Sequence, residues 1–125
     1  GPWLRSVLER EGVNVSLSPT IENSATRNAY VLTGEDGNRV FLGFSTQRCA
    51  DALLNAQDHL PLQALQATEL LYFGSVMQAD AASRRFIQAL LASRASHTLT
   101  VYDPNLRLSL WSSPTEAYSE VAATF

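Results

Sequence analysis

The stretch "LLYFGSVMQADAASRRFIQALLASRASHTLTVYD", residues 70–103, decides the fold that we expect. Two short apolar runs, residues 70–73 and 99–102, flank a segment in which apolar residues recur at helical spacing. The apolar face of this helix consists of Ala82, Phe86, Ala89 and Leu90. Arg84 and Arg85 lie on the opposite face, which we expect to be exposed to solvent. A strand, a helix and a strand in this order predict a parallel strand pair joined by a right-handed crossover, so we expect an α/β fold.

A second pattern, in residues 26–45, predicts a β-hairpin. Apolar residues lead into and out of a turn around Asp36 and Gly37, two residue types that tolerate positive φ. The hairpin is expected to have an apolar face made of Val31, Val40, Leu42 and Phe44. Two strands alone cannot bury such a face, so the pattern indicates that another surface covers it.

Helices are expected near both ends of the chain. The first has apolar residues at helical spacing and ends before Gly12, a residue suited to a left-handed cap. The last begins where Ser113 and Glu116 have the spacing of a capping box. Both tryptophans, Trp3 and Trp111, are expected to pack against the core.

Length and composition narrow the possible functions. The 125 residues suffice for one compact domain, residues 1–125. A formal net charge of −3 argues against non-specific nucleic-acid binding, and no apolar run is long enough for a membrane span. All 9 basic residues are arginine, which excludes enzyme mechanisms that need a lysine amine for a Schiff base or a phosphate contact. The single cysteine, Cys49, supports neither a disulfide framework nor a zinc site. We expect a soluble cytoplasmic protein.

The stretch "VYDPNLRLSLW", residues 101–111, places polar side chains directly after a strand. Open α/β sheets bind ligands at the carboxyl ends of their parallel strands. Asp103, Asn105 and Arg107 are therefore candidate site residues, and Gly74 and Ser75 lie at the end of the other strand. A structural interpretation also stands: Asp103 and Asn105 shape a turn, Arg107 pairs with a carboxylate, and Gly74 only allows a turn.

Taken together, "LLYFGSV", the arginine-bearing helix and "VYDPNLRLSLWSSPTEA" resemble the middle of a PfkB (ribokinase-like) carbohydrate kinase of the fructokinase and ketodeoxygluconate kinase branch. "GEDGNRVF" is similar to the lid hairpin of these kinases, and "CADALL" to the segment after it. The resemblance implies a partial ribokinase-like fold, with a parallel βαβ layer over about residues 69–125 and a projecting lid over about residues 26–45.

The resemblance also implies roles for single residues. Asp103 would help to organise magnesium or water, Asn105 would hydrogen-bond near the transferred phosphate, and Arg107 would steady its charge. Gly74 and Ser75 would line the sugar cleft. ATP and magnesium are the cofactors of the related kinases.

The sequence departs from these kinases in two respects. It has neither the Gly-Gly-x-x-x-Asn sugar motif nor the Gly-Ala-Gly-Asp motif that supplies the anion hole and catalytic base, so we expect no catalytic residue, metal site or cofactor in this chain alone. Ser45 and Thr46 also stand where the kinases often have an aromatic residue and an arginine. Arg48 replaces that arginine only if the alignment shifts by two positions.

Three functional hypotheses follow. The first is a non-catalytic, oligomeric binding or scaffold protein derived from a sugar kinase, joined to a second copy through the lid hairpin. The second is a fragment or split half of an active ATP-dependent kinase, completed by another protein chain. The third, less favoured, is a sensor that keeps part of the sugar cleft. None of them involves nucleic acid or a membrane.

Overall fold

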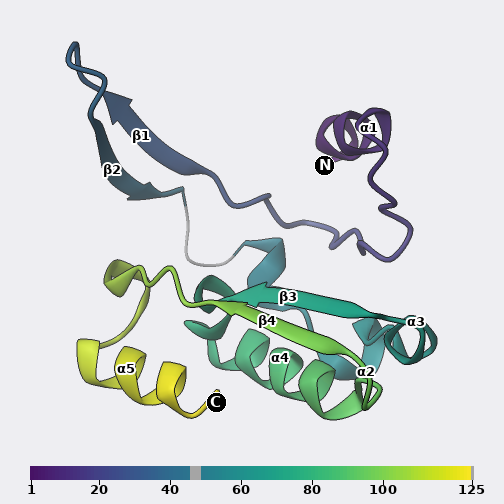
Figure 1. Cartoon of the computed structure of the whole chain (residues 1–125). Coiled ribbons are helices and arrows are strands. Elements are labelled where there is room, and N and C mark those ends of the chain that lie inside the picture. The colour runs from purple at the N-terminus through teal and green to yellow at the C-terminus, as the bar shows by residue number, and fades with distance from the viewer. Residues whose placement is uncertain (46–48, 125) are drawn as a thin grey trace. The chain divides into compact units, whose positions relative to one another are not determined.

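The computed structural model describes residues 1–45 and 49–124. The chain forms two compact units, Gly1–Leu53 and Leu54–Phe125, which are described separately (Figure 1). Among the described residues, no helix is both long and apolar enough to cross a membrane.

The first unit contains one helix and the hairpin. Its elements are α1 (Pro2–Arg10), β1 (Ala29–Thr33), β2 (Arg39–Phe44) and the 3-10 helix η1 (Ala50–Leu53). After α1 the chain turns at Gly12, which has a φ of +79° as expected for a left-handed cap. The expectation for Trp3 was wrong, because its side chain is 75% exposed on α1.

The hairpin is antiparallel as predicted, but its register divides the expected apolar face. Val31 pairs with Phe41, and Leu32 pairs with Val40. A bulge between Tyr30 and Val31 leaves an extra residue in β2, close to Gly43. Paired residues share a face and neighbours alternate, so the four expected side chains cannot lie together. One face carries Val31, Phe41 and Phe44; the other carries Tyr30, Leu32, Val40 and Leu42.

The second unit contains the predicted βαβ arrangement. Its elements are α2 (Ala56–His59), α3 (Leu62–Gln66), β3 (Leu70–Gly74), the 3-10 helix η2 (Ser75–Gln78), α4 (Ala81–Ser93), β4 (Leu99–Asp103), the 3-10 helix η3 (Leu108–Leu110) and α5 (Pro114–Ala122). β3 and β4 pair in parallel, with Leu70 opposite Leu99 and Gly74 opposite Asp103. The expected α/β class is therefore confirmed.

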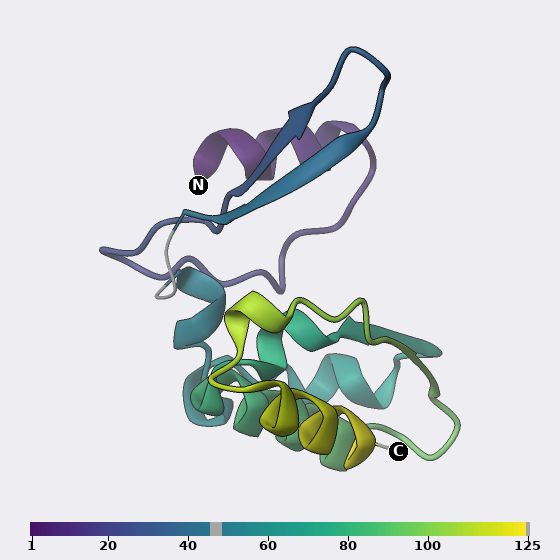
Figure 2. The same ribbon diagram turned by 90° about the vertical axis from the view of Figure 1, so that its left-hand side faces the viewer.

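Helix α4 lies along one face of the strand pair (Figures 1 and 2). Its buried side chains are Ser83, Phe86 and Ile87. Ala82, Ala89 and Leu90 are only half-buried, so the predicted apolar face was about one residue out of register. On the strands, Phe73 and Tyr102 point to this covered side, with ring centroids 4.8 Å apart.

Within the second unit, the described residues leave the opposite face of the strand pair uncovered, and we call it the bare face. Side chains alternate along a strand, so the residues next to Phe73 and Tyr102 point away from α4. The apolar side chains exposed on this face are Leu70, Tyr72, Leu99 and Val101. Parallel strands are normally covered on both faces, so this surface is unusual for an isolated unit.

Helix α5 is held by polar contacts in addition to its buried Ala117. The Ser113 hydroxyl accepts a hydrogen bond from the Glu116 amide at 3.1 Å, which confirms the N-cap. The Glu116 carboxylate does not complete the capping box, because it binds Arg84 and the Ser112 hydroxyl instead. Arg84 was expected on a solvated helix face, but its side chain is only 13% exposed. Trp111 is buried as expected.

Candidate functional site

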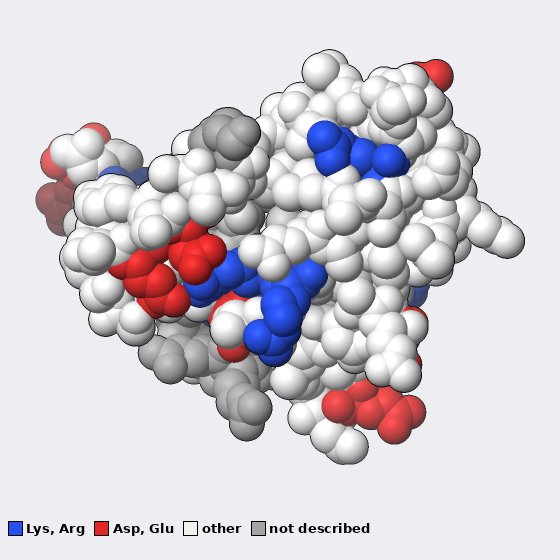
Figure 3. All heavy atoms as spheres, turned by 90° about the horizontal axis from the view of Figure 1, so that it is seen from below, with Lys and Arg blue, Asp and Glu red and all other residues white. Residues whose placement is uncertain are grey.

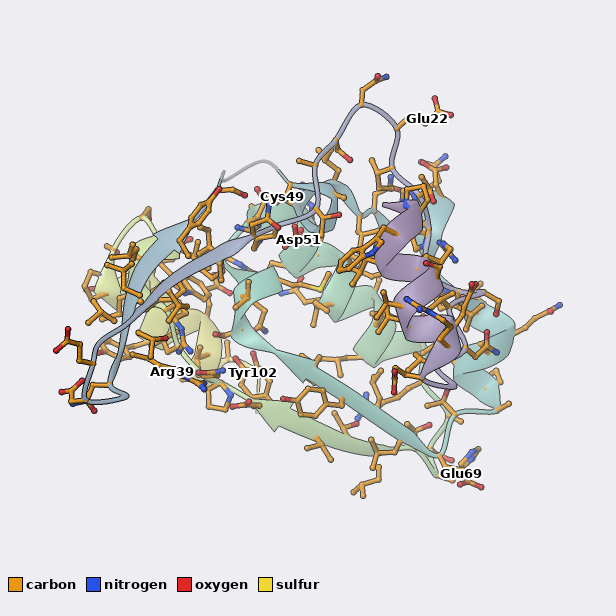
Figure 4. All side chains as sticks on the ribbon, turned by 90° about the horizontal axis from the view of Figure 1, so that it is seen from above. Glu22, Arg39, Cys49, Asp51, Glu69 and Tyr102 are labelled. Carbon is orange, nitrogen blue, oxygen red and sulfur yellow. The ribbon has the colours of Figure 1, made fainter. Side chains whose placement is uncertain are left out.

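The candidate site lies where β3 and β4 end. Because the strands are parallel, their carboxyl ends meet at one edge, with Gly74 directly opposite Asp103. Figure 4 shows Tyr102 near this end of the pair and Glu69 at the other. The structure therefore brings together Asp103 with Gly74 and the following Ser75.

Asp103 is held by a tyrosine that the sequence did not single out. The Tyr72 hydroxyl donates a hydrogen bond to Asp103 Oδ2 at 3.0 Å. This bond raises the pKa of Tyr72, because loss of the phenol proton would remove the bond and place a second negative charge beside the carboxylate. Strand alternation was the signal that could have found Tyr72, since it places residues 72 and 103 on the same face.

Asn105 and Arg107, which follow the strand end, contact each other. Asn105 has a φ of +26°, at the edge of the left-handed region. Arg107 Nη1 donates to the Asn105 carbonyl oxygen at 3.1 Å and to Asn105 Oδ1 at 2.5 Å. These contacts fit the turn interpretation of this stretch.

Gly74 and Ser75 are both constrained by their surroundings. A Cβ atom at residue 74 would lie 3.0 Å from the Asp103 carbonyl oxygen, so the close approach of the two strand ends favours glycine here. Ser75 is 1% exposed, and its hydroxyl has no hydrogen-bond partner among the described residues. A buried hydroxyl without a partner is costly, which makes Ser75 an exception among the buried polar groups of this unit.

A polar chain fixes the end of β4 from the covered side. The Tyr102 hydroxyl donates to Gln78 Oε1 at 2.6 Å, and Gln78 Nε2 donates to Thr124 Oγ1 at 2.9 Å. Burial raises the pKa of Tyr102. The strand that carries Asp103 is thus tied to the segment after α5.

The base of the hairpin holds a separate cluster in the first unit. Arg27 Nε lies 2.8 Å from Asp51 Oδ2, and the Arg27 guanidinium lies 5.4 Å from the centre of the Phe44 ring. Figure 4 shows Asp51 close to Cys49 at the start of η1. Ser45 extends the strand pairing through its amide, which donates to the Asn28 carbonyl at 2.9 Å. Ser45 therefore has a structural role here.

Two expectations for this region lie outside the described residues: Thr46, and Arg48 as a substitute arginine. Gly34 and Gly37 do not form a phosphate-binding loop. The Gly37 amide donates to the Gly34 carbonyl at 3.0 Å, and the Gly34 amide donates to the Asn38 carbonyl at 2.8 Å. Their amides are used within the hairpin turn.

Metal ligands and surface charge bear on which ligands the described ranges could hold. Residues 1–45 and 49–124 contain no group of three or more His, Cys, Asp or Glu side chains that could hold a metal ion. On the face shown in Figure 3, acidic and basic side chains lie next to one another. A continuous basic surface, as nucleic-acid binding requires, is not seen on that face.

Comparison with known proteins decides the family. The family model described as pfkB family carbohydrate kinase matches residues 1–124. The chain belongs to this family. It is 30% identical over 122 residues to probable fructokinase-3 of Arabidopsis thaliana, an alignment that covers 97% of this chain and 35% of the relative.

Solved fructokinase structures have the same fold. The apo fructokinase of Vibrio cholerae O395 superposes with a TM-score of 0.76 at 24% identity, covering 98% of this chain and 41% of that chain. The form of that enzyme with fructose, ADP and calcium ion bound gives a TM-score of 0.70 at 24% identity. The expected partial ribokinase-like fold is thereby confirmed. The chain spans about a third of the length of the curated relatives that it matches.

Proposed function

We propose that this chain is one part of an ATP-dependent sugar kinase of the fructokinase type, and that phosphoryl transfer requires further polypeptide. The observation that carries this proposal is the bare face of β3 and β4 in a chain that spans about a third of its relatives. The additional polypeptide is either a continuation of this chain or a separate protein chain.

Four apolar side chains on that face are exposed to solvent. Leu70, Tyr72 and Leu99 are 55%, 61% and 61% exposed, and Val101 is 36% exposed. An exposed apolar side chain of this size gains about 1.5–3 kcal/mol when it is fully buried. Among the described residues, β3 and β4 pair only with each other, so both outer edges of the pair lack a strand partner. Further strands and helices would cover these edges and this face.

This chain contributes the hairpin and the Asp103 strand end to such a kinase. Asp103 presents a carboxylate at the edge of a parallel sheet, where α/β enzymes bind ligands. Phosphoryl transfer depends on positioning and on neutralising charge around the transferred group. The sequence contains no Gly-Ala-Gly-Asp motif for the anion hole and base, so we propose that the chain alone is not catalytic.

ATP and a divalent cation belong to this proposal as cofactors of the completed kinase. The described residues at the strand end supply one carboxylate, Asp103, and no cluster of ligands that would form a metal site by itself. Asn105 Oδ1 accepts a hydrogen bond from Arg107. We therefore assign no metal ligand in this chain. Because the proposed activity uses ATP, we propose a cytoplasmic location.

The second candidate is a non-catalytic, oligomeric scaffold. It is favoured by the internal contacts of two residues expected near the substrate: Arg107 binds Asn105, and Ser45 pairs with Asn28. In this candidate the apolar faces serve only to assemble copies of the chain, with the hairpin as the proposed contact.

A chimera separates the two candidates. Residues 1–124 of this chain replace the matching segment of the Vibrio cholerae fructokinase, which the superposition defines over 98% of this chain. If the chain is one part of a kinase, the chimera should phosphorylate fructose in the presence of ATP. If the chain is a scaffold, the chimera should transfer no phosphate. Cooperative unfolding of the chimera would show that it is folded.

A further inference from the structure

The geometry points to Tyr72 as the positioning residue that fixes the orientation of the Asp103 carboxylate. This inference rests on the proposed function, in which the Asp103 strand end faces a ligand. It assigns a role to a residue that was not among the candidates from the sequence.

The register of the strands explains why Tyr72 can reach this carboxylate. Tyr72 pairs with Val101, and Gly74 pairs with Asp103. Residues 72, 74, 101 and 103 therefore point to the same face of the pair. Gly74 has no side chain, so the space directly beside Asp103 on this face receives no side chain from its pairing partner. The tyrosine side chain leans along the strand into that space and approaches Asp103 diagonally.

The hydrogen bond fixes more than one oxygen atom. The Tyr72 hydroxyl donates to Asp103 Oδ2 at 3.0 Å, a normal length for this kind of bond. A carboxylate is planar, so holding Oδ2 and Cβ also determines the direction of Oδ1. Tyrosine suits this purpose because its ring is rigid and its hydroxyl both donates and accepts.

The backbone supports the same orientation. A Cβ atom at residue 74 would lie 3.0 Å from the Asp103 carbonyl oxygen, so the two strand ends approach closely. From the covered side, Tyr102 is tied to Gln78 by a 2.6 Å hydrogen bond. The backbone on which Asp103 sits is thus restrained, and the remaining freedom is the rotation of its side chain. Tyr72 removes that freedom.

Nuclear magnetic resonance on the whole chain tests the contact without any activity. In the unmodified chain, three-bond couplings at Asp103 are expected to report one χ1 rotamer. In Tyr72→Phe, which keeps the ring and loses only the hydroxyl, the couplings are expected to average over rotamers. Tyr118→Phe is the matched control, since Tyr118 is 59% exposed on α5. Unchanged Asp103 couplings in Tyr72→Phe would overturn the inference.

Kinetics of the fructokinase chimera test the consequence. Misplacement of a reacting group by about 1 Å can lower a rate by about 100-fold. We therefore expect Tyr72→Phe to lower kcat by about tenfold or more and to leave KM for fructose little changed. An unchanged kcat in Tyr72→Phe, beside a large loss in Asp103→Asn, also overturns the inference. If the proposed function itself is wrong, the chimera with Tyr72 in place will be folded but inactive. In that case the Asp103 couplings alone decide the contact.

Discussion

Arg84 on α4 and Glu116 on α5 form an ion pair, with Arg84 Nη2 2.8 Å from Glu116 Oε1. Arg84 Nη1 also pairs with Glu120, and Arg84 Nε donates to the Gln78 carbonyl at 2.8 Å. The guanidinium lies 5.5 Å from the centre of the buried Trp111 ring. One arginine thus joins α4, η2, α5 and the loop that follows the candidate site.

Replacing Arg84 by methionine is expected to loosen α5. Methionine keeps the apolar stem but removes the hydrogen bonds to charged partners, so we expect a loss of about 1–3 kcal/mol in the free energy of unfolding. Urea unfolding measures this loss. Trp111 fluorescence should shift to longer wavelength, in a Trp3→Phe background that removes the exposed tryptophan. Arg85→Met is the control, because Arg85 is exposed. Equal effects at residues 84 and 85 would contradict this account.

The pH dependence of stability should include a contribution from Glu116. The hydrogen bond from the Ser112 hydroxyl, followed by the one from Arg84, lowers the pKa of Glu116. A group whose pKa is lower in the folded state stabilises the protein above its unfolded pKa, and this contribution is lost as pH falls through the folded pKa. When the pH is lowered from neutral to about 3, the free energy of unfolding should therefore fall less in Glu116→Gln than in the unmodified chain. Thermal unfolding across this range measures it, with exposed Glu11→Gln as the control.

The sequence predicted the elements whose cause is local. The amphipathic spacing around Phe86, the Asp36-Gly37 turn and the Ser113 cap each depend on a few neighbouring residues, and each is present in the structure. The parallel pairing of β3 and β4 followed from the order strand, helix, strand.

The contacts that were missed depend on residues far apart in the chain. Arg84 is separated from Glu116 by 32 positions, so a helical pattern alone assigned it to solvent. Tyr72 and Asp103 are separated by 31 positions, and their contact depends on the strand register. The pairing of Val31 with Phe41 separates Val31 from Val40 and Leu42, and the bulge near Gly43 places Phe44 on the Val31 face, so the expected apolar face is divided.

We expect the chain to form a dimer through the hairpin face that carries Tyr30, Leu32, Val40 and Leu42. On this face the side chains are 52–58% exposed, while on the other face Phe44 is half-buried and packs with Phe41 and Arg27. Leu42→Asp is expected to convert the dimer to a monomer in light scattering, because it places a charge in the apolar contact. Val31→Asp, on the opposite face, should leave the dimer intact. A monomeric unmodified chain would contradict this prediction.

The bulge in the hairpin is expected to depend on Gly43. Its φ of +134° is one that residues with side chains rarely adopt, so Gly43→Ala should cost about 1–3 kcal/mol in local stability. Hydrogen exchange of the β1 and β2 amides measures this, and the amides of α4 in the second unit serve as an internal reference. Thr33→Ala is the control at a position with ordinary backbone geometry. Unchanged exchange in Gly43→Ala would show that the bulge tolerates a side chain.

The central claim is that this chain is one part of a sugar kinase and needs further polypeptide for chemistry. Its most direct test is transfer of labelled phosphate from ATP to fructose, measured side by side for the isolated chain and for the Vibrio cholerae fructokinase chimera. The account predicts product from the chimera, loss of most of that product with Asp103→Asn, and none above the buffer blank from the isolated chain. Turnover by the isolated chain, or a folded chimera without product, would contradict it.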